Sequence, residues 1–245
     1  MKIVAMLRIK NEARWLREVL LSIHPLTKEI TIFDDHSTDE SVLIAESLGA
    51  KVIHSEFPPN DTDEARDKNL LLAAVRATSP EYVLSIDGDE VLSAGAAEKI
   101  LAQLSPRNAL YCFPFKYLWN DREHYRADGV YGDYHQWRMF SLIRQPEKLW
   151  FSSKSGGSFH CGNTPKGLIG SGIMVQADIL HLGYMDQEDR LRKFAWYNRI
   201  DPNNSAEDRY RHMVIGDLFS ESSQFVHGGP LKVFRLAAGL WPEMG

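Results

Sequence analysis

The first half of the chain alternates short apolar runs with stretches of helical periodicity. The apolar runs at residues 2–7, 29–33, 51–54 and 82–86 predict four strands. Between them, residues 12–24, 37–48 and 64–78 repeat apolar positions three and four apart, which predicts three helices. Because strand and helix alternate, we expect an α/β fold with a mostly parallel sheet and helices on both faces.

Local signals predict the first and last residues of the second helix and the buried face of the third. Ser37 and Glu40 stand three apart and match a capping box, so we expect the second helix to begin after Ser37. Gly49 follows its last apolar residue and predicts a left-handed helix end. In the third helix, Leu70 and Leu71 belong to the apolar face that we expect to be buried.

The second half of the chain has a less regular pattern. It predicts a helix at 96–104, strands at 108–117, 137–143 and 179–182, and helices at 186–199 and from about 206, with a Gly- and Ser-rich loop at 152–172. Residues 231–241 are apolar with interspersed cations and predict an amphipathic helix, hence a helical C-terminus. Neither repeats nor low-complexity tracts interrupt residues 1–245, so we expect a single domain.

Composition and charge narrow the classes of function. The 245 residues are 44% hydrophobic and 25% charged, which is ordinary for a globular protein, and the formal net charge is -5. This acidic balance argues against a nucleic-acid-binding protein. The chain has two distant cysteines, and it contains neither a signal-peptide core nor an apolar run long enough to span a membrane. These features predict a cytoplasmic protein. The amphipathic tail leaves peripheral contact with the inner face of the membrane open.

The most informative motif is Asp87-Gly88-Asp89-Glu90, which follows the fourth predicted strand. Ligands of parallel sheets bind beyond the carboxyl ends of the strands, where Arg8 and Asp35 are also expected. Two carboxylates separated by a glycine can converge on a divalent cation, while Gly88 lets a ligand approach closely. A plain polar turn is the alternative for this short motif taken alone.

Several well-known sites are excluded by their missing residues. The chain has no GxGxxG after its first strand, no GxxxxGK[ST] and no HExxH, and its two cysteines lack the spacing of a zinc site. The EF-hand pattern also fails, because Val91 occupies the third ligand position. Dinucleotide, P-loop, zinc and EF-hand chemistry are therefore not predicted.

Three blocks together resemble one known family. The blocks at residues 7–12 (LRIKNE), 33–39 (FDDHSTD) and 85–90 (SIDGDE) are similar to the KNE, DDGSTD and DxD signatures of family 2 glycosyltransferases, in the same order. The resemblance covers about residues 1–95 and implies the GT-A fold. It also implies that this half binds a nucleotide sugar, while residues 96–245 form the acceptor side.

The resemblance implies a set of site residues. Nucleotide-sugar binding would fall to Leu7, Arg8, Glu12, Asp35, Arg66, Lys68, Asp87 and Gly88. Asp35 would contact a uracil-like base. Arg66 and Lys68 would face the nucleotide and its diphosphate, and the alternative for these two cations is a solvated helix face. Asp89 would ligate Mn²⁺ or Mg²⁺, and His181 would complete the metal site, unless it is a satisfied core histidine. Such a cation would neutralise the departing diphosphate as a Lewis acid.

The residues leave the catalytic base open. An inverting transferase needs a carboxylate or histidine to deprotonate the acceptor hydroxyl. The candidates are His160, Asp128 and Asp133. His160 lies where related chains tend to carry a His-Glu pair, but Cys161 replaces the acid here.

These observations predict a metal-dependent, inverting glycosyltransferase that moves a sugar from a UDP-linked donor to a hydroxyl of a glycan or lipid-linked acceptor. One alternative is a sugar-phosphate nucleotidyltransferase, although the loop after the first strand lacks the glycines typical of that class. Another is a non-catalytic nucleotide-sugar-binding subunit, which the missing base keeps open.

Overall fold

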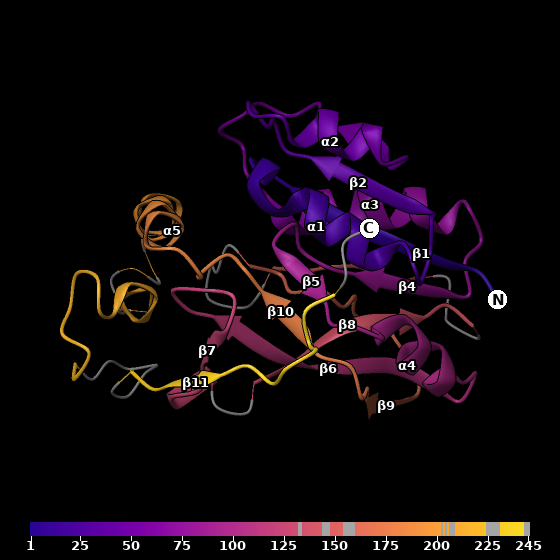
Figure 1. Ribbon diagram of the computed structural model, residues 1–245. Helices are drawn as coiled ribbons and strands as arrows, with labels where there is room; N and C mark the ends of the chain where they lie inside the picture. Colours follow the sequence, from indigo (N-terminus) through magenta and orange to yellow (C-terminus); the bar gives the residue numbers. More distant parts are fainter. Residues whose placement is uncertain are drawn as a thin grey trace.

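The computed structural model of the chain describes residues 1–131, 134–143, 148–153, 160–201, 203, 205, 209–223 and 231–242. Its first half contains four parallel strands, β1 (Ile3–Ile9), β2 (Ile30–Asp34), β3 (Lys51–His54) and β4 (Tyr82–Ser85), which lie in the order β4-β1-β2-β3. The mostly parallel α/β sheet predicted from the sequence is thereby confirmed (Figure 1).

Helices cover both faces of these strands. Helices α1 (Ala13–Ile23) and α2 (Ser41–Ser47) pack on one face, and α3 (Glu64–Arg76) packs on the other. Successive residues of a strand point to opposite faces, so Leu7 joins the core under α1, whereas Met6 joins the core under α3. This alternation decides which residues of β1 can reach the site.

The second half extends the same sheet. Its elements are β5 (Glu90–Leu92), α4 (Ala96–Gln103), β6 (Asn108–Leu118), β7 (His124–Arg126), η1 (Gly129–Tyr131), β8 (His135–Ser141), β9 (Ser171–Met174), β10 (Ile179–His181), α5 (Gln187–Ile200), η2 (Arg211–Val214) and β11 (Val233–Arg235). Strand β8 joins β4 in antiparallel pairing, and the long strand β6 pairs with β7, β8, β9 and β10. A single sheet therefore runs through both halves of the chain.

The predicted capping box is wrong, because α2 begins only at Ser41 and its N-cap residue, Glu40, makes no side-chain cap. The Ser37 hydroxyl instead accepts a hydrogen bond from the Asn11 backbone N–H at 2.9 Å. The carboxylate of Asp39 accepts from Ser41 N–H, and also from Ala13 N–H at the start of α1. Ser37 and Asp39 thus bind the β1–α1 loop as well as α2, a tertiary use that local spacing cannot show.

Two further expectations about apolar residues differ from the structure. Leu70 is 45% exposed, whereas Leu71 and Leu72 are buried, because α3 turns a neighbouring stripe toward the sheet. Within residues 231–242 the predicted amphipathic helix is wrong: β11 pairs antiparallel with β7. The open edge of β7 satisfies the backbone groups of this segment, and Phe234 remains exposed.

Among the residues that the structure describes, none of the helices is both long and apolar enough to cross a membrane. The sequence predicts a helix from about residue 206, but residues 206–208 lie outside the described part of the chain. The left-handed residue expected at the end of α2 is confirmed, since Gly49 has a φ of 80°.

Candidate active site

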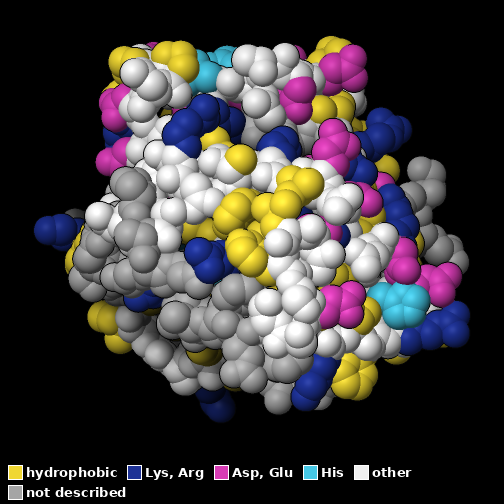
Figure 2. All heavy atoms as spheres, turned by 90° about the vertical axis from the view of Figure 1, so that its left-hand side faces the viewer, with side chains coloured by type: hydrophobic (Ala, Val, Ile, Leu, Met, Phe, Trp, Pro, Cys, Tyr) yellow, Lys and Arg dark blue, Asp and Glu magenta, His cyan; other side chains and the backbone are white. Residues whose placement is uncertain are grey.

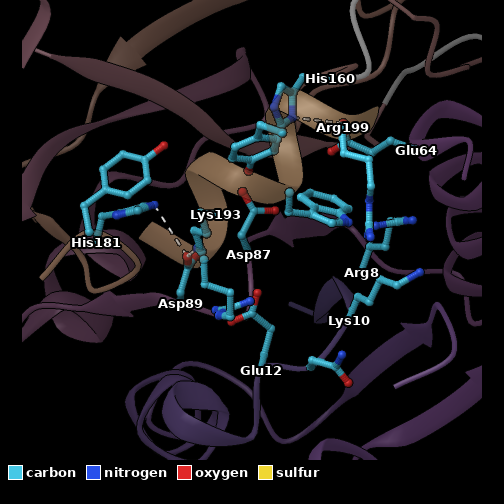
Figure 3. Close-up of a pocket in the computed structure, with 16 residues that line it drawn as sticks. Arg8, Lys10, Glu12, Glu64, Asp87, Asp89, His160, His181, Lys193 and Arg199 are labelled. Carbon is cyan, nitrogen blue, oxygen red and sulfur yellow. Dashed lines mark hydrogen bonds and ion pairs between the residues drawn. The ribbon is translucent and has the colours of Figure 1, made fainter. Parts of the chain in front are cut away.

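A cavity of about 370 Å³ lies beyond the carboxyl ends of β1 and β4 (Figure 3). The β1–α1 loop, the turn after β4, the start of α3 and helix α5 all contribute to its walls. Its lining residues are Arg8, Lys10, Asn11, Glu12, Glu64, Asp87, Gly88, Asp89, His160, His181, Tyr184, Arg192, Lys193, Trp196, Tyr197 and Arg199. Of the residues predicted from the sequence, Arg8, Glu12, Asp87, Gly88, Asp89, His160 and His181 are thus brought together.

Arg8 reaches the cavity from the face of β1 that carries α3. Its guanidinium donates to Asp35 at 2.6 Å and to Asp67 at 2.9 Å, and Lys10 donates to the same Asp35 oxygen at 3.1 Å. Asp35 is buried and does not line the cavity. The Asp35 carboxylate therefore lies behind Arg8 and Lys10 and holds both cations in place. Leu7 points to the opposite face and packs in the core, so its side chain does not line the cavity. The prediction that the Leu7 side chain contributes to the nucleotide pocket is therefore wrong.

Neither of the two α3 cations predicted to face the nucleotide lines the cavity. Arg66 pairs with Asp61 and Asp67, and its guanidinium lies 3.5 Å from the centre of the Phe57 ring. Lys68 is buried, and its ammonium donates to Glu64, to the Gly162 carbonyl and to the Asn163 side chain. A solvated helix face is therefore wrong for Lys68, which instead binds residues 162–163 to α3.

The turn after β4 is held by neighbours on several strands. The Asp87 carboxylate accepts from Asn163 at 3.0 Å, and the Asp87 N–H donates to Glu90. Glu90 in turn accepts two hydrogen bonds from Arg138, at 2.6 and 2.8 Å, so it links the Asp87 backbone to β8 and orients the motif. A Cβ on Gly88 would lie 2.8 Å from Cγ of Glu12. The space at Gly88 is thus filled by the Glu12 stem.

Asp89 forms a buried ion pair with Lys193 of α5, beside His181. Burial by itself raises the pKa of Asp89, but the Lys193 ammonium outweighs it and holds that pKa well below its usual value. Burial lowers the pKa of His181 to about 4, although the neighbouring Asp89 acts in the opposite direction. Near neutral pH the structure therefore places an anion, a cation and a neutral imidazole together.

The residues around Asp89 do not fit a resident divalent cation in this arrangement. His181 Nε2 lies 3.6 Å from Oδ2 of Asp89, so these two atoms could face one ion, but the Lys193 ammonium contacts the same oxygen. Within the described residues, no group of three or more His, Cys, Asp or Glu side chains is suited to hold a metal ion. Hard divalent cations can take their remaining oxygen ligands from phosphate and water, so it is the Lys193 ammonium on the Asp89 oxygen that keeps a resident ion from this pair.

A second polar group lies across the cavity. Nδ1 of His160 is 3.6 Å from Oε2 of Glu64, and the His160 ring packs edge-on against Tyr197 at 5.1 Å (Figure 3). Burial by itself raises the pKa of Glu64, but the Lys68 ammonium and His160 outweigh it, so the pKa lies well below its usual value. Glu64 thus supplies, from α3, the carboxylate that Cys161 does not provide next to His160.

Of the other two candidates for the base, only Asp128 lies among the described residues. Asp128 is buried at the end of β7, where it accepts from Arg126 at 2.8 to 3.1 Å and from Lys232 N–H at 2.9 Å. It does not line the cavity. Asp133 lies outside the described residues.

Replacing Asp128 by asparagine is expected to lower the free energy of unfolding by about 3 kcal/mol, because Arg126 is left buried without its charge partner. Urea unfolding measures this change. The exposed pair of Glu123 and Arg235 provides the control, since Glu123→Gln should cost less than about 1 kcal/mol. Equal losses for the two variants would show that Asp128 is not a buried structural anchor.

Several lining residues were missed by the sequence motifs. Helix α5 presents Arg192, Lys193, Trp196, Tyr197 and Arg199 to the cavity. All five lie three or four positions from another of the set, a helical spacing that a search for polar and aromatic stripes on the predicted helix could have found. Glu64 gave no local signal, because its partner His160 lies 96 positions away in sequence.

Comparisons with known proteins place the chain in a family. The glycosyl transferase family 2 model matches residues 6–163. An uncharacterized protein of Mycobacterium tuberculosis is 25% identical over 216 residues, which cover 83% of this chain and 51% of that protein. An uncharacterized glycosyltransferase of Rickettsia bellii is 33% identical over 99 residues, covering 40% of this chain and 31% of that protein. The chain thus spans about half the length of the first curated relatives it matches.

Solved structures show similar chains at low identity. Staphylococcus aureus TarS (residues 1–349) in complex with UDP has a TM-score of 0.49 and 15% identity, covering 86% of this chain and 69% of that one. Glucosyl-3-phosphoglycerate synthase from M. tuberculosis, in complex with Mn²⁺, UDP and glucosyl-3-phosphoglycerate, has a TM-score of 0.35 and 24% identity, with 47% and 44% coverage. Since the family model spans well over half of the chain, the protein belongs to glycosyl transferase family 2.

Proposed function

We propose that the protein transfers a sugar from a nucleoside-diphosphate donor, UDP-linked by preference, to a hydroxyl group of a glycan or lipid-linked acceptor. The observation that carries this proposal is the charge of the cavity at the carboxyl edge of the sheet, together with the family. Five Lys and Arg side chains line it with four Asp and Glu side chains, although the whole chain is acidic. Such a cavity suits an anionic ligand whose sugar also needs hydrogen-bond acceptors.

The residues of the cavity take complementary roles in this proposal. Arg8 and Lys10, which are held by Asp35, face the nucleotide end of the donor. Asp87 is partly exposed and accepts hydrogen bonds from hydroxyls of ribose or sugar. Trp196 of α5 offers an aromatic face, against which the apolar face of a sugar ring can pack.

His160 acts as the general base. Glu64 lies on the Nδ1 side of the His160 ring and orients the imidazole. The imidazole takes the proton of the acceptor hydroxyl while that oxygen attacks the anomeric carbon. The bond from this carbon to the diphosphate oxygen breaks, and its electron pair leaves with the diphosphate. Attack opposite to the leaving group inverts the anomeric centre.

We infer that residues 1–95 bind the nucleotide of the donor, that residues 96–245 supply the acceptor side together with the α5 wall of the cavity, and that the two parts act as one unit. Support comes from the pairing of β4 with β8, which joins the two parts within one sheet. It also comes from the cavity itself, since Asp89 and Lys193 meet across the two parts. A glycan or lipid-linked acceptor would enter from the side of α5 (Figure 1).

A panel of nucleotide sugars tests the proposed function. We expect UDP and at least one UDP-sugar to raise the melting temperature and to bind in calorimetry. We also expect slow release of UDP from that donor when water is the acceptor. Release of pyrophosphate from UTP and a sugar phosphate would instead identify a nucleotidyltransferase. Binding of the donor without turnover, toward water or an added acceptor, would identify a non-catalytic subunit.

A further inference from the structure

Helix α5 places a lysine where the sequence predicts a metal ion. Its ammonium contacts Oδ2 of Asp89, the oxygen that also faces His181 (Figure 3). The Lys193 side chain is only 11% exposed, and its ammonium nitrogen lies 5.8 Å from the centre of the Tyr184 ring. The cation is therefore part of the cavity wall and not a surface lysine that happens to point inward.

The chain leaves dedicated room for this ion pair. Gly183 follows β10 by two residues, and a Cβ at this position would overlap both the Asp89 carboxylate and the Lys193 ammonium. The backbone at Gly183 does not need a left-handed conformation. Glycine is thus needed at this position because the pair of Asp89 and Lys193 occupies the space that a side chain would fill.

A divalent ion and Lys193 compete for the same oxygen. Two positive charges about 4 Å apart repel each other by about 4 kcal/mol per unit charge product at an effective dielectric constant of 20. Arg192 and Arg199 of the same helix add positive charge to this wall of the cavity. Lys and Arg side chains are also visible on the surface of the molecule that is seen from the side of α5 (Figure 2).

We propose that Lys193 is the cation that neutralises the donor diphosphate, in the place that a divalent metal ion was expected to take. This inference rests on the proposed function. An ammonium has three N–H donors, so contact with Asp89 is compatible with hydrogen bonds to phosphate oxygens. As the bond to the anomeric carbon breaks, the negative charge that develops on the leaving phosphate oxygen is stabilised by the Lys193 charge. Asp89 positions the ammonium and takes no part as a metal ligand.

Calorimetric titration of the whole chain with UDP, once with EDTA and once with MnCl₂, tests this assignment. We expect the two Kd values to agree within about twofold in the wild-type protein. Lys193→Met should weaken UDP binding in EDTA by about 100-fold, and Lys193→Arg, which keeps the charge, by much less. Lys99→Met on α4 is the matched control and should leave the Kd unchanged. Circular dichroism verifies that each variant is folded.

Where UDP binds, either of two results would overturn the proposal. One is a wild-type Kd for UDP that rises tenfold or more when Mn²⁺ is removed, a comparison that needs no variant. The other is a folded Lys193→Met protein that binds UDP as tightly as the wild type in EDTA. If UDP fails to bind under both conditions, the proposed donor is wrong, and inorganic pyrophosphate replaces UDP as the probe. Absence of any Lys193-dependent pyrophosphate binding would then overturn the Lys193 assignment as well.

Discussion

Replacing His160 by alanine is expected to lower kcat by roughly 10²- to 10⁴-fold, the usual contribution of a general base. The loss should fall on kcat and leave the KM for the donor nearly unchanged, because in the proposed function the diphosphate binds to the cations that line other walls of the cavity. Glu64→Gln should reduce kcat by a smaller factor, since it removes the carboxylate near Nδ1 but leaves the imidazole. Steady-state kinetics with a fixed acceptor measures both effects.

His124→Ala is the matched control for His160. This histidine of β7 pairs with the exposed Asp121 and does not line the cavity. Its replacement should leave kcat within about twofold of the wild type. A folded His160→Ala protein with wild-type kcat would assign the base to another residue.

Gly183→Ala is expected to lower the free energy of unfolding by about 3 kcal/mol and to abolish donor binding. The added Cβ would overlap Asp89 and Lys193, so the buried ion pair must separate or the backbone after β10 must shift. Either change leaves a charge without its partner in a buried place. Urea unfolding and calorimetry with UDP measure the two effects separately.

Gly49→Ala provides the comparison for Gly183. No atom lies within 4 Å of a Cβ at Gly49, but its φ of 80° makes alanine strained by about 1 kcal/mol. This variant should lose stability without losing UDP binding. If Gly183→Ala bound UDP like Gly49→Ala, the tight packing around Asp89 would not be needed for donor binding.

Some features of the site followed from the sequence because they depend on order along the chain. Alternating strands and helices predict the sheet, and the position of Asp87 and Asp89 directly after β4 places them at its carboxyl edge. Arg8 and Glu12 follow the same logic at the end of β1. The three short blocks also identified the family, since their order and spacing are a local property of the chain.

Partners across the fold could not be predicted in this way. Glu64 and His160 lie on different segments, and so do Asp89 and Lys193, so their proximity depends on how α3 and α5 pack against the sheet. The same holds for Lys68, whose charge was expected in the nucleotide site but is used by buried groups around residue 163. Lys and Arg side chains are long and flexible, so the sequence alone does not reveal which carboxylate each of them pairs with.

The sequence by itself therefore determined the α/β sheet, the edge at which the site forms and the family to which the chain belongs. The tertiary structure decided which carboxylate accompanies His160, which residue neutralises Asp89, and that residues 233–235 form an edge strand and not a helix. The physical reason is the range of the interactions. Hydrophobic periodicity and strand order act between near neighbours in the chain, whereas ion pairs and open sheet edges act between residues that only folding brings together.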